Sequence, residues 1–185
     1  LLAVGTAGSP GTRLFCVAGA VARPGLYELA GDTTLRSLLT QAGAGELSSV
    51  LLGGAAGTFI PAAELDLELS FEATRKVGAT LGSGVVLAFG PETPIEPVLH
   101  KLAAFFRDES CGQCVPCRVG TVRQEELLTR LRRKEPRGSV QDEIALLGEL
   151  DQVMRDASIC GLGQTASSAV VSAIRTGLYR PEEAS

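Results

Sequence analysis

The stretch ESCGQCVPCR, residues 109–118, contains three of the five cysteines of the chain. Such close clustering suits thiolate ligands of a metal better than disulfides, and it favours a reducing compartment. The C-x-x-C-x-x-C spacing wraps one loop around a single iron–sulfur cluster, and a cubane cluster then needs a fourth thiolate from elsewhere. The motif therefore predicts a 4Fe–4S site that a distant cysteine completes.

Cys160 is the predicted fourth ligand, because it lies between the third and fourth of four helices expected in the second half of the chain. In an up-down bundle, that connection and the one carrying the motif can lie at the same end. Cys117 and Cys160 are expected just before helices, whose first N–H groups favour thiolates. The candidate cofactor-binding and metal-ligating residues are thus Cys111, Cys114, Cys117 and Cys160, and no catalytic residue is assigned.

The neighbours of these cysteines also suit a cluster. Gly112, Gly161 and Gly163 are expected to leave room for backbone N–H groups to reach the sulfurs, and Arg118 is expected to add positive charge. Hydrogen bonds and charge of this kind tune the reduction potential of a cluster.

Other interpretations of the cysteines remain open. Zinc also takes four thiolates, although usually from two separated C-x-x-C pairs. A redox dithiol at Cys111 and Cys114 would leave Cys117 unexplained. Cys16 stands alone in an apolar stretch and is predicted to be a packed core thiol.

Two further features are interpreted as structural. His100, the single histidine, is expected to be a surface or half-buried residue. The basic run of residues 130–134 is expected to be a solvated helix end, where positive charge is favourable.

Composition limits the classes of partner. The chain has 185 residues, 45% of them hydrophobic, and a net charge of −4 that falls within residues 1–97, which argues against nucleic acid. Neither an apolar run of about 20 residues nor a signal-peptide pattern is visible, so we expect a cytoplasmic protein without direct membrane insertion. The absence of an initial Met suggests a fragment or a processed chain.

The hydrophobic pattern predicts an α+β fold in two parts. Strands are expected at residues 14–21, 26–29, 50–52, 58–61 and 85–89, with a helix from Leu35, and four amphipathic helices follow a proline-rich linker. The predicted organisation is a lead-in at 1–13, a sheet domain at 14–90, a linker at 91–97, a helical domain at 98–180 and a tail at 181–185.

The segments ESCGQCVPCRVGT and ICGLGQTA resemble the iron–sulfur domain of the NADH-binding flavoprotein subunit of respiratory complex I. The same module occurs in NAD-dependent formate dehydrogenases and bidirectional hydrogenases. Upstream, GAVARPGLYEL, GGAAGTFIP and LGSGVVLAFG resemble its ubiquitin-like β-grasp domain, the SLBB domain. The resemblance implies a β-grasp domain followed by a 4Fe–4S four-helix bundle, and the four named cysteines match the ligands of the family one for one.

The resemblance also implies a function. The chain would be an electron-transfer module of an NADH dehydrogenase-type complex, or of a formate dehydrogenase or hydrogenase. The glycine fingerprint of a dinucleotide site is absent from this sequence, so FMN and NAD(H) are expected on a partner domain or chain. Further expected partners are a small thioredoxin-like 2Fe–2S subunit and a larger iron–sulfur or catalytic subunit. The alternative is a β-grasp binding module with a structural four-cysteine zinc site.

Overall fold

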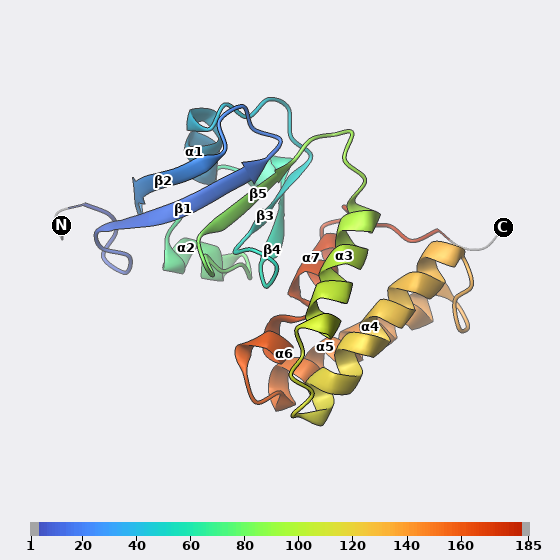
Figure 1. Cartoon of the computed structure of the whole chain (residues 1–185). Helices are drawn as coiled ribbons and strands as arrows, with labels where there is room; N and C mark the ends of the chain where they lie inside the picture. Colours follow the sequence, from blue (N-terminus) through green and yellow to red (C-terminus); the bar gives the residue numbers. More distant parts are fainter. Residues whose placement is uncertain (1–3, 183–185) are drawn as a thin grey trace. The chain divides into compact units, whose positions relative to one another are not determined.

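A five-stranded mixed sheet forms the first of two units, which comprise residues 1–93 and 94–185 (Figure 1). The structure is a computed structural model that describes residues 4–182. The strand order is β2-β1-β5-β3-β4, and β1 runs parallel to β5 while all other neighbours are antiparallel. The strands are β1 (Thr12–Gly19), β2 (Gly25–Ala30), β3 (Ser49–Leu52), β4 (Thr58–Pro61) and β5 (Val85–Phe89), which confirms the five predicted positions.

The sheet packs one face against α1 (Leu35–Gln41), which begins after the capping side chain of Thr34. Alternation along β1 turns Phe15 and Val17 into this core, where they are at most 1% exposed. The same alternation turns Cys16 to the opposite face, where its side chain is exposed. The prediction of a packed core thiol at Cys16 is therefore wrong.

Two short elements in this unit were not predicted, η1 (Ala62–Glu64) and α2 (Phe71–Lys76). Glu72 of α2 accepts hydrogen bonds from the hydroxyls of Thr6 and Ser9, which ties residues near the start of the chain to this helix. These hydrogen bonds, the Thr6 one foremost, lower the pKa of the Glu72 carboxyl to about 2. The carboxylate is therefore the form that holds the contact at neutral pH.

The second unit is entirely helical in its regular structure within residues 94–182. Its core is formed by apolar side chains that include Leu99, Leu127, Leu147 and Val170, each at most 2% exposed. Helix α4 packs beside both α3 and α5 (Figure 1). The helices are α3 (Ile95–Asp108), α4 (Val115–Arg133), α5 (Val140–Ala157), α6 (Gly161–Thr165) and α7 (Ser168–Arg175). Among residues 4–182, no helix is long and apolar enough to cross a membrane.

The predicted fourth helix is interrupted, so α6 and α7 stand where one helix was expected. The buried side chain of Gln124 donates a hydrogen bond from Nε2 to the carbonyl of Ala166, at 3.1 Å. That carbonyl lies in the turn between α6 and α7, and a bond from another helix satisfies it there. The apolar periodicity favours one continuous helix here, but a hydrogen bond from a residue distant in the sequence stabilises the break.

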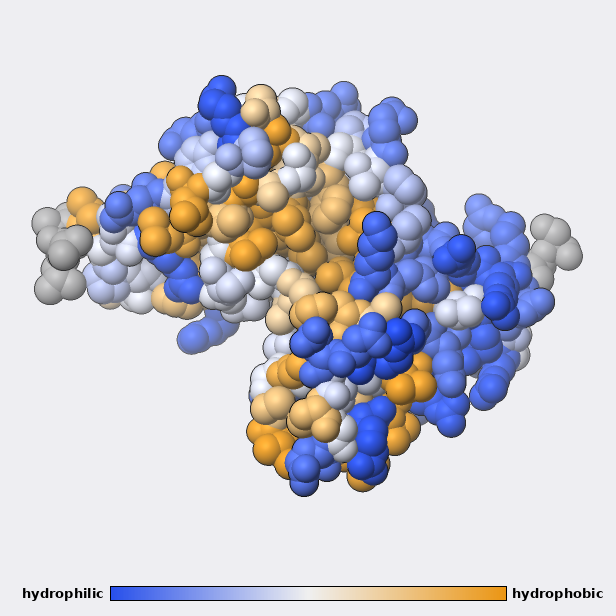
Figure 2. All heavy atoms as spheres, in the orientation of Figure 1, coloured by the Kyte–Doolittle hydropathy of each residue, from blue (hydrophilic) through white to orange (hydrophobic). Residues whose placement is uncertain are grey.

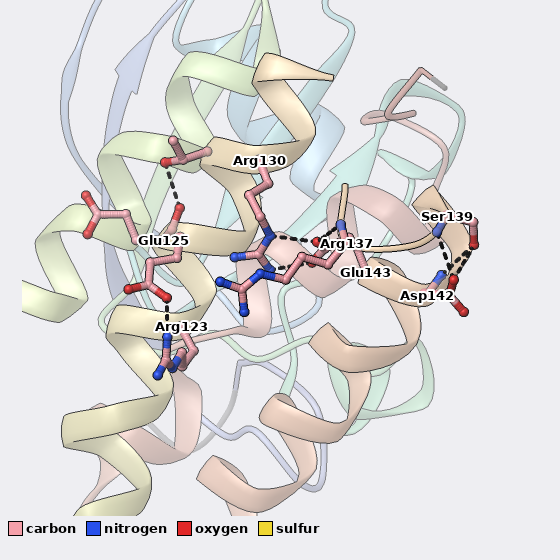
Figure 3. A network of polar contacts seen from close by, with 9 residues as sticks. Arg123, Glu125, Arg130, Arg137, Ser139, Asp142 and Glu143 are labelled. Carbon is pink, nitrogen blue, oxygen red and sulfur yellow. Dashed lines mark hydrogen bonds and ion pairs between the residues drawn. The ribbon is translucent and has the colours of Figure 1, made fainter. Parts of the chain in front are cut away.

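A buried ion pair joins α4 to α5 (Figure 3). Arg130 donates two hydrogen bonds to the Glu143 carboxylate, both at 2.6 Å, and the backbone N–H of Arg137 donates a third. Glu143 is 1% exposed, and its pKa is lowered, foremost by the Arg130 hydrogen bond. Beside the pair, Ser139 and Asp142 form a capping box at the start of α5.

The basic run at the end of α4 is thus only partly a solvated surface. Arg132, Arg133 and Lys134 are exposed, as expected, but Arg130 is turned towards α5 and paired. The helical spacing explains the difference, because Arg130 follows Leu127 by three residues and shares its inward side of the helix.

Replacing Glu143 by Ala is expected to destabilise the helical unit by about 3 to 5 kcal/mol, because the Arg130 guanidinium is left inside without its counter-charge. The folded-state pKa of Glu143 lies below its ordinary value of 4.5, so its contribution is complete above pH 4.5. That contribution is lost as the pH falls through the folded-state pKa. Denaturant unfolding followed by circular dichroism at pH 7 and below pH 4.5 measures both effects.

The matched control is Glu126→Ala, which removes an exposed carboxylate paired with Arg123 on the same helix. Exposed pairs contribute about 0 to 1 kcal/mol. An equal loss of unfolding free energy in the two variants would contradict the assignment of Glu143–Arg130 as the pair that joins α4 to α5.

Candidate metal centre

The first turn of α4 carries two of the three clustered cysteines. Cys114 is the N-cap residue, with an extended backbone and no capping hydrogen bond from its side chain. Cys117 was expected just before the helix but lies inside its first turn, because Pro116 is accepted at a position where no backbone N–H is needed. Cys117 is only 5% exposed. The first N–H groups of α4 are therefore left free to face thiolates.

The loop before α4 is held in shape by its own polar contacts. Gly112 has a φ of +72°, a left-handed conformation that glycine adopts without strain. Arg118 donates from Nη1 to the Gly112 carbonyl at 2.9 Å, so it braces the loop as well as adding charge. The Ser110 hydroxyl lies 3.3 Å from the Cys117 sulfur.

The connection between α5 and α6 brings in the fourth cysteine. Cys160 is the N-cap residue of α6, which agrees with its predicted position just before a helix. Its side chain is exposed. Gln164 donates from Nε2 to the Ser158 carbonyl at 3.0 Å and closes this connection on itself. Helix α6 packs against both α4 and α5 at this end of the unit (Figure 1).

Gly163 allows the two cysteine segments to meet. A Cβ atom at this position would lie 2.8 Å from the Cys117 Cβ and 2.3 Å from the Ser158 Oγ. Both distances are shorter than van der Waals contact, so only a residue without a side chain fits between α4 and the α5–α6 connection. Gly161, which was expected to leave room for backbone N–H groups near the sulfurs, has open space where its Cβ would be.

The close packing of these two segments affects the pKa of the Cys114 thiol. Its thiol pKa is lowered, first by the backbone N–H of Ile159 and next by that of Cys117. One of these donors comes from the α5–α6 connection and the other from the first turn of α4. The Ser158 hydroxyl, which is buried without a well-formed hydrogen bond of its own, adds a smaller effect in the same direction. Both segments thus stabilise negative charge on this sulfur.

Two of the four predicted ligands, Cys114 and Cys117, lie against the segment around Cys160. The side chains of Cys111 and Cys160 are exposed. No three Cys, His, Asp or Glu side chains between residues 4 and 182 converge closely enough to hold one metal ion. A single zinc ion would require thiolates at about 2.3 Å. A cubane spreads its four thiolates over different irons, so a donor set of four cysteines from two separate segments suits a cluster.

Apolar side chains surround the candidate site. Ile159, Val115 and Val119 are 74%, 58% and 44% exposed, and each is within two residues of a candidate ligand. The space-filling view shows hydrophobic surface at the end of the helical unit where α6 lies (Figure 2). His100 is half-buried, as expected, and lies near Glu96 rather than near a cysteine.

Sequence analysis missed two residues of this site, Ser110 and Ser158. Ser110 stands within the quoted motif, but nothing in its spacing indicates that its hydroxyl faces Cys117. Ser158 precedes Cys160 by two residues, and only its packing against Gly163 brings it near the other segment.

The sequence matches two known families. Residues 97–182 match the 4Fe–4S family described as the NADH-ubiquinone oxidoreductase-F iron-sulfur binding region, and residues 14–48 match the SLBB domain family. The chain therefore combines an SLBB segment with an iron–sulfur binding region, and the predicted 4Fe–4S cofactor is confirmed at the level of the family.

Individual similar proteins indicate the kinds of enzyme complex in which this combination of domains occurs. The F-type subunit of the NADH-quinone oxidoreductase of Mycobacterium tuberculosis (strain H37Rv) is 34% identical over 176 residues, which are 93% of this chain and 39% of that protein. The HndC subunit of the NADP-reducing hydrogenase of Solidesulfovibrio fructosivorans is 29% identical over 94% of this chain and 36% of its own length. The chain is thus a relative of F-type NADH-quinone oxidoreductase subunits and of hydrogenase subunits, and it spans about two fifths of their length.

A solved structure supports the same relationship. The crystal structure of an NAD⁺-reducing [NiFe]-hydrogenase in the H₂-reduced state contains a chain that matches with a TM-score of 0.83 and 34% identity. The match covers 94% of this chain and 29% of that chain. The mixed fold, a five-stranded sheet with several helices, is therefore shared with a hydrogenase subunit.

Replacing Gly163 by Ala is expected to destabilise the helical unit by about 1 to 3 kcal/mol, because the new methyl group overpacks the contact with Cys117 and Ser158. The iron content of the protein purified without oxygen should fall with it. Gly161→Ala is the control, since its methyl group would enter open space directly after Cys160 in the same helix. Thermal unfolding and an iron assay compare the two variants, and an equal loss of iron in both would contradict the role given to Gly163.

Proposed function

We propose that Cys111, Cys114, Cys117 and Cys160 hold one 4Fe–4S cluster and that this chain relays single electrons. The observation that carries the proposal is the close contact of the first turn of α4 with α6, which starts directly after Cys160, at Gly163. When bound, the cluster supplies reversible one-electron transfer. The residues of the chain orient the thiolates, present backbone N–H groups to their negative charge and limit the access of water to Cys117.

The proposed architecture assigns a task to each unit. The sheet unit is an SLBB-type β-grasp domain spanning residues 14–90, and the helical unit, residues 98–180, is a four-helix bundle that carries the cluster. The match of residues 14–48 to the SLBB family supports the first assignment. The long helices α3, α4 and α5, with α6 and α7 together in the place of a fourth, support the second.

The proposed electron path requires partners. The four cysteines would hold a cluster that accepts electrons one at a time, and a reduced flavin on a neighbouring domain or chain would be the donor of electrons from NADH. A small thioredoxin-like 2Fe–2S subunit and a larger iron–sulfur or catalytic subunit are the proposed neighbours in a cytoplasmic or membrane-attached complex. Because similarity extends to hydrogenase subunits over nearly the whole chain, electron transfer in a hydrogenase is the second candidate function.

The ligand assignment predicts the composition of the protein purified without oxygen. We expect about four irons and four sulfides per chain, and a low-temperature EPR signal after dithionite reduction. Replacing Cys160 by Ala should abolish or convert that signal, because the fourth iron loses its thiolate. Iron and sulfide assays together with EPR provide the measurement.

The matched control is Cys16→Ala, which removes the exposed cysteine of the sheet unit. Its iron content and EPR signal should equal those of the unaltered protein. Stoichiometric zinc with no EPR signal would contradict the electron-transfer proposal and favour a structural four-cysteine zinc site.

A further inference from the structure

The Ser110 hydroxyl is the side-chain group that faces the buried cysteine of the site. Its Oγ lies 3.3 Å from the Cys117 Sγ, within hydrogen-bond distance for a sulfur acceptor. Cys117 is 5% exposed, while Cys111 and Cys160 are exposed. Water therefore competes little for this sulfur, and a hydrogen bond to it is stronger than one at the surface.

The direction of this hydrogen bond follows from the chemistry of the two groups. A thiol and a hydroxyl can each donate, but a thiolate that binds iron has no proton and only accepts. On its other side, the Ser110 Oγ accepts a hydrogen bond from the backbone N–H of Gly112 at 3.3 Å. One oxygen lone pair is thereby occupied, and the hydroxyl proton is free to point at the Cys117 sulfur.

The hydroxyl is held in place by contacts within the chain. Ser110 follows the C-terminus of α3, and its backbone N–H donates to the Arg107 carbonyl. Arg107 in turn pairs with Glu125 of α4, which fixes the end of α3 against the helix that carries Cys117. Such preorganisation means that little conformational freedom is lost when the hydroxyl meets the thiolate.

We propose that Ser110 sets the reduction potential of the cluster by donating a hydrogen bond to the Cys117 thiolate. The inference rests on the proposed function, since it requires the cluster on these cysteines. Reduction adds one electron, and therefore one negative charge, to the cluster and its thiolates, while the hydroxyl proton remains on Ser110. A donor aimed at a ligand sulfur stabilises the more negative state, so Ser110 raises the potential.

The test compares two substitutions of Ser110 in the whole chain purified without oxygen with its cluster loaded. Ser110→Ala removes the hydroxyl, and Ser110→Thr retains it. Ser37→Ala, which removes an exposed hydroxyl from α1, is the matched control. Iron and sulfide content, the EPR spectrum and the midpoint potential in an EPR-monitored redox titration are measured for each protein.

The expected result is a lower midpoint potential for Ser110→Ala at unchanged iron and sulfide content, with Ser110→Thr and Ser37→Ala at or near the original potential. An unshifted potential in Ser110→Ala would overturn the inference. So would equal shifts in the Ala and Thr variants, or loss of the cluster in Ser110→Ala, because either result would assign the side chain to packing. Absence of iron from the unaltered protein is a distinct outcome, which would overturn the proposed function and this inference with it.

Discussion

The close approach of α4 and α6 at Gly163 is the constraint on which the rest of the candidate site depends. Because the Cys117 Cβ and the Ser158 Oγ occupy the space next to this glycine, no side chain fits there. The approach places a backbone N–H of the α5–α6 connection against the Cys114 sulfur. The absence of a side chain at Gly163 therefore lets α4 and α6 approach each other closely enough to bring Cys117 near the start of α6.

Helix starts supply the electrostatic part of this arrangement. Cys114 and Cys160 occupy N-cap positions, and the sulfur of Cys114 already faces the backbone N–H of Cys117 in the first turn of α4. Such N–H groups are available to thiolates, and the helix dipole favours the negative charge of a reduced cluster. The Arg130–Glu143 pair acts at the other end of the α4–α5 hairpin, where it holds α5 in the position from which its far end reaches the cysteines.

Local patterns predicted most of the secondary structure, and tertiary contacts explain the exceptions. The strands were recognisable as short apolar stretches separated by turn residues, and the four-helix pattern of the second half was recognisable from its apolar periodicity. The break after α6 was not recognisable, because it depends on Gln124, a residue of another helix. Cys16 and Arg130 were assigned to the wrong environments for a similar reason. Polarity alone does not reveal which side of a strand or helix faces a partner.

The sequence by itself determined the type of site. It supplies three cysteines at C-x-x-C-x-x-C spacing and a fourth before a later helix, and the thiolate character of these ligands does not depend on the backbone conformation. Only the tertiary structure decided which groups surround those sulfurs. The Ser110 hydroxyl, the Ile159 N–H and the space at Gly163 come from segments whose spacing along the chain carries no signal. The physical reason is that ligand identity is a property of single residues, whereas hydrogen bonds to a sulfur depend on how separate helices pack.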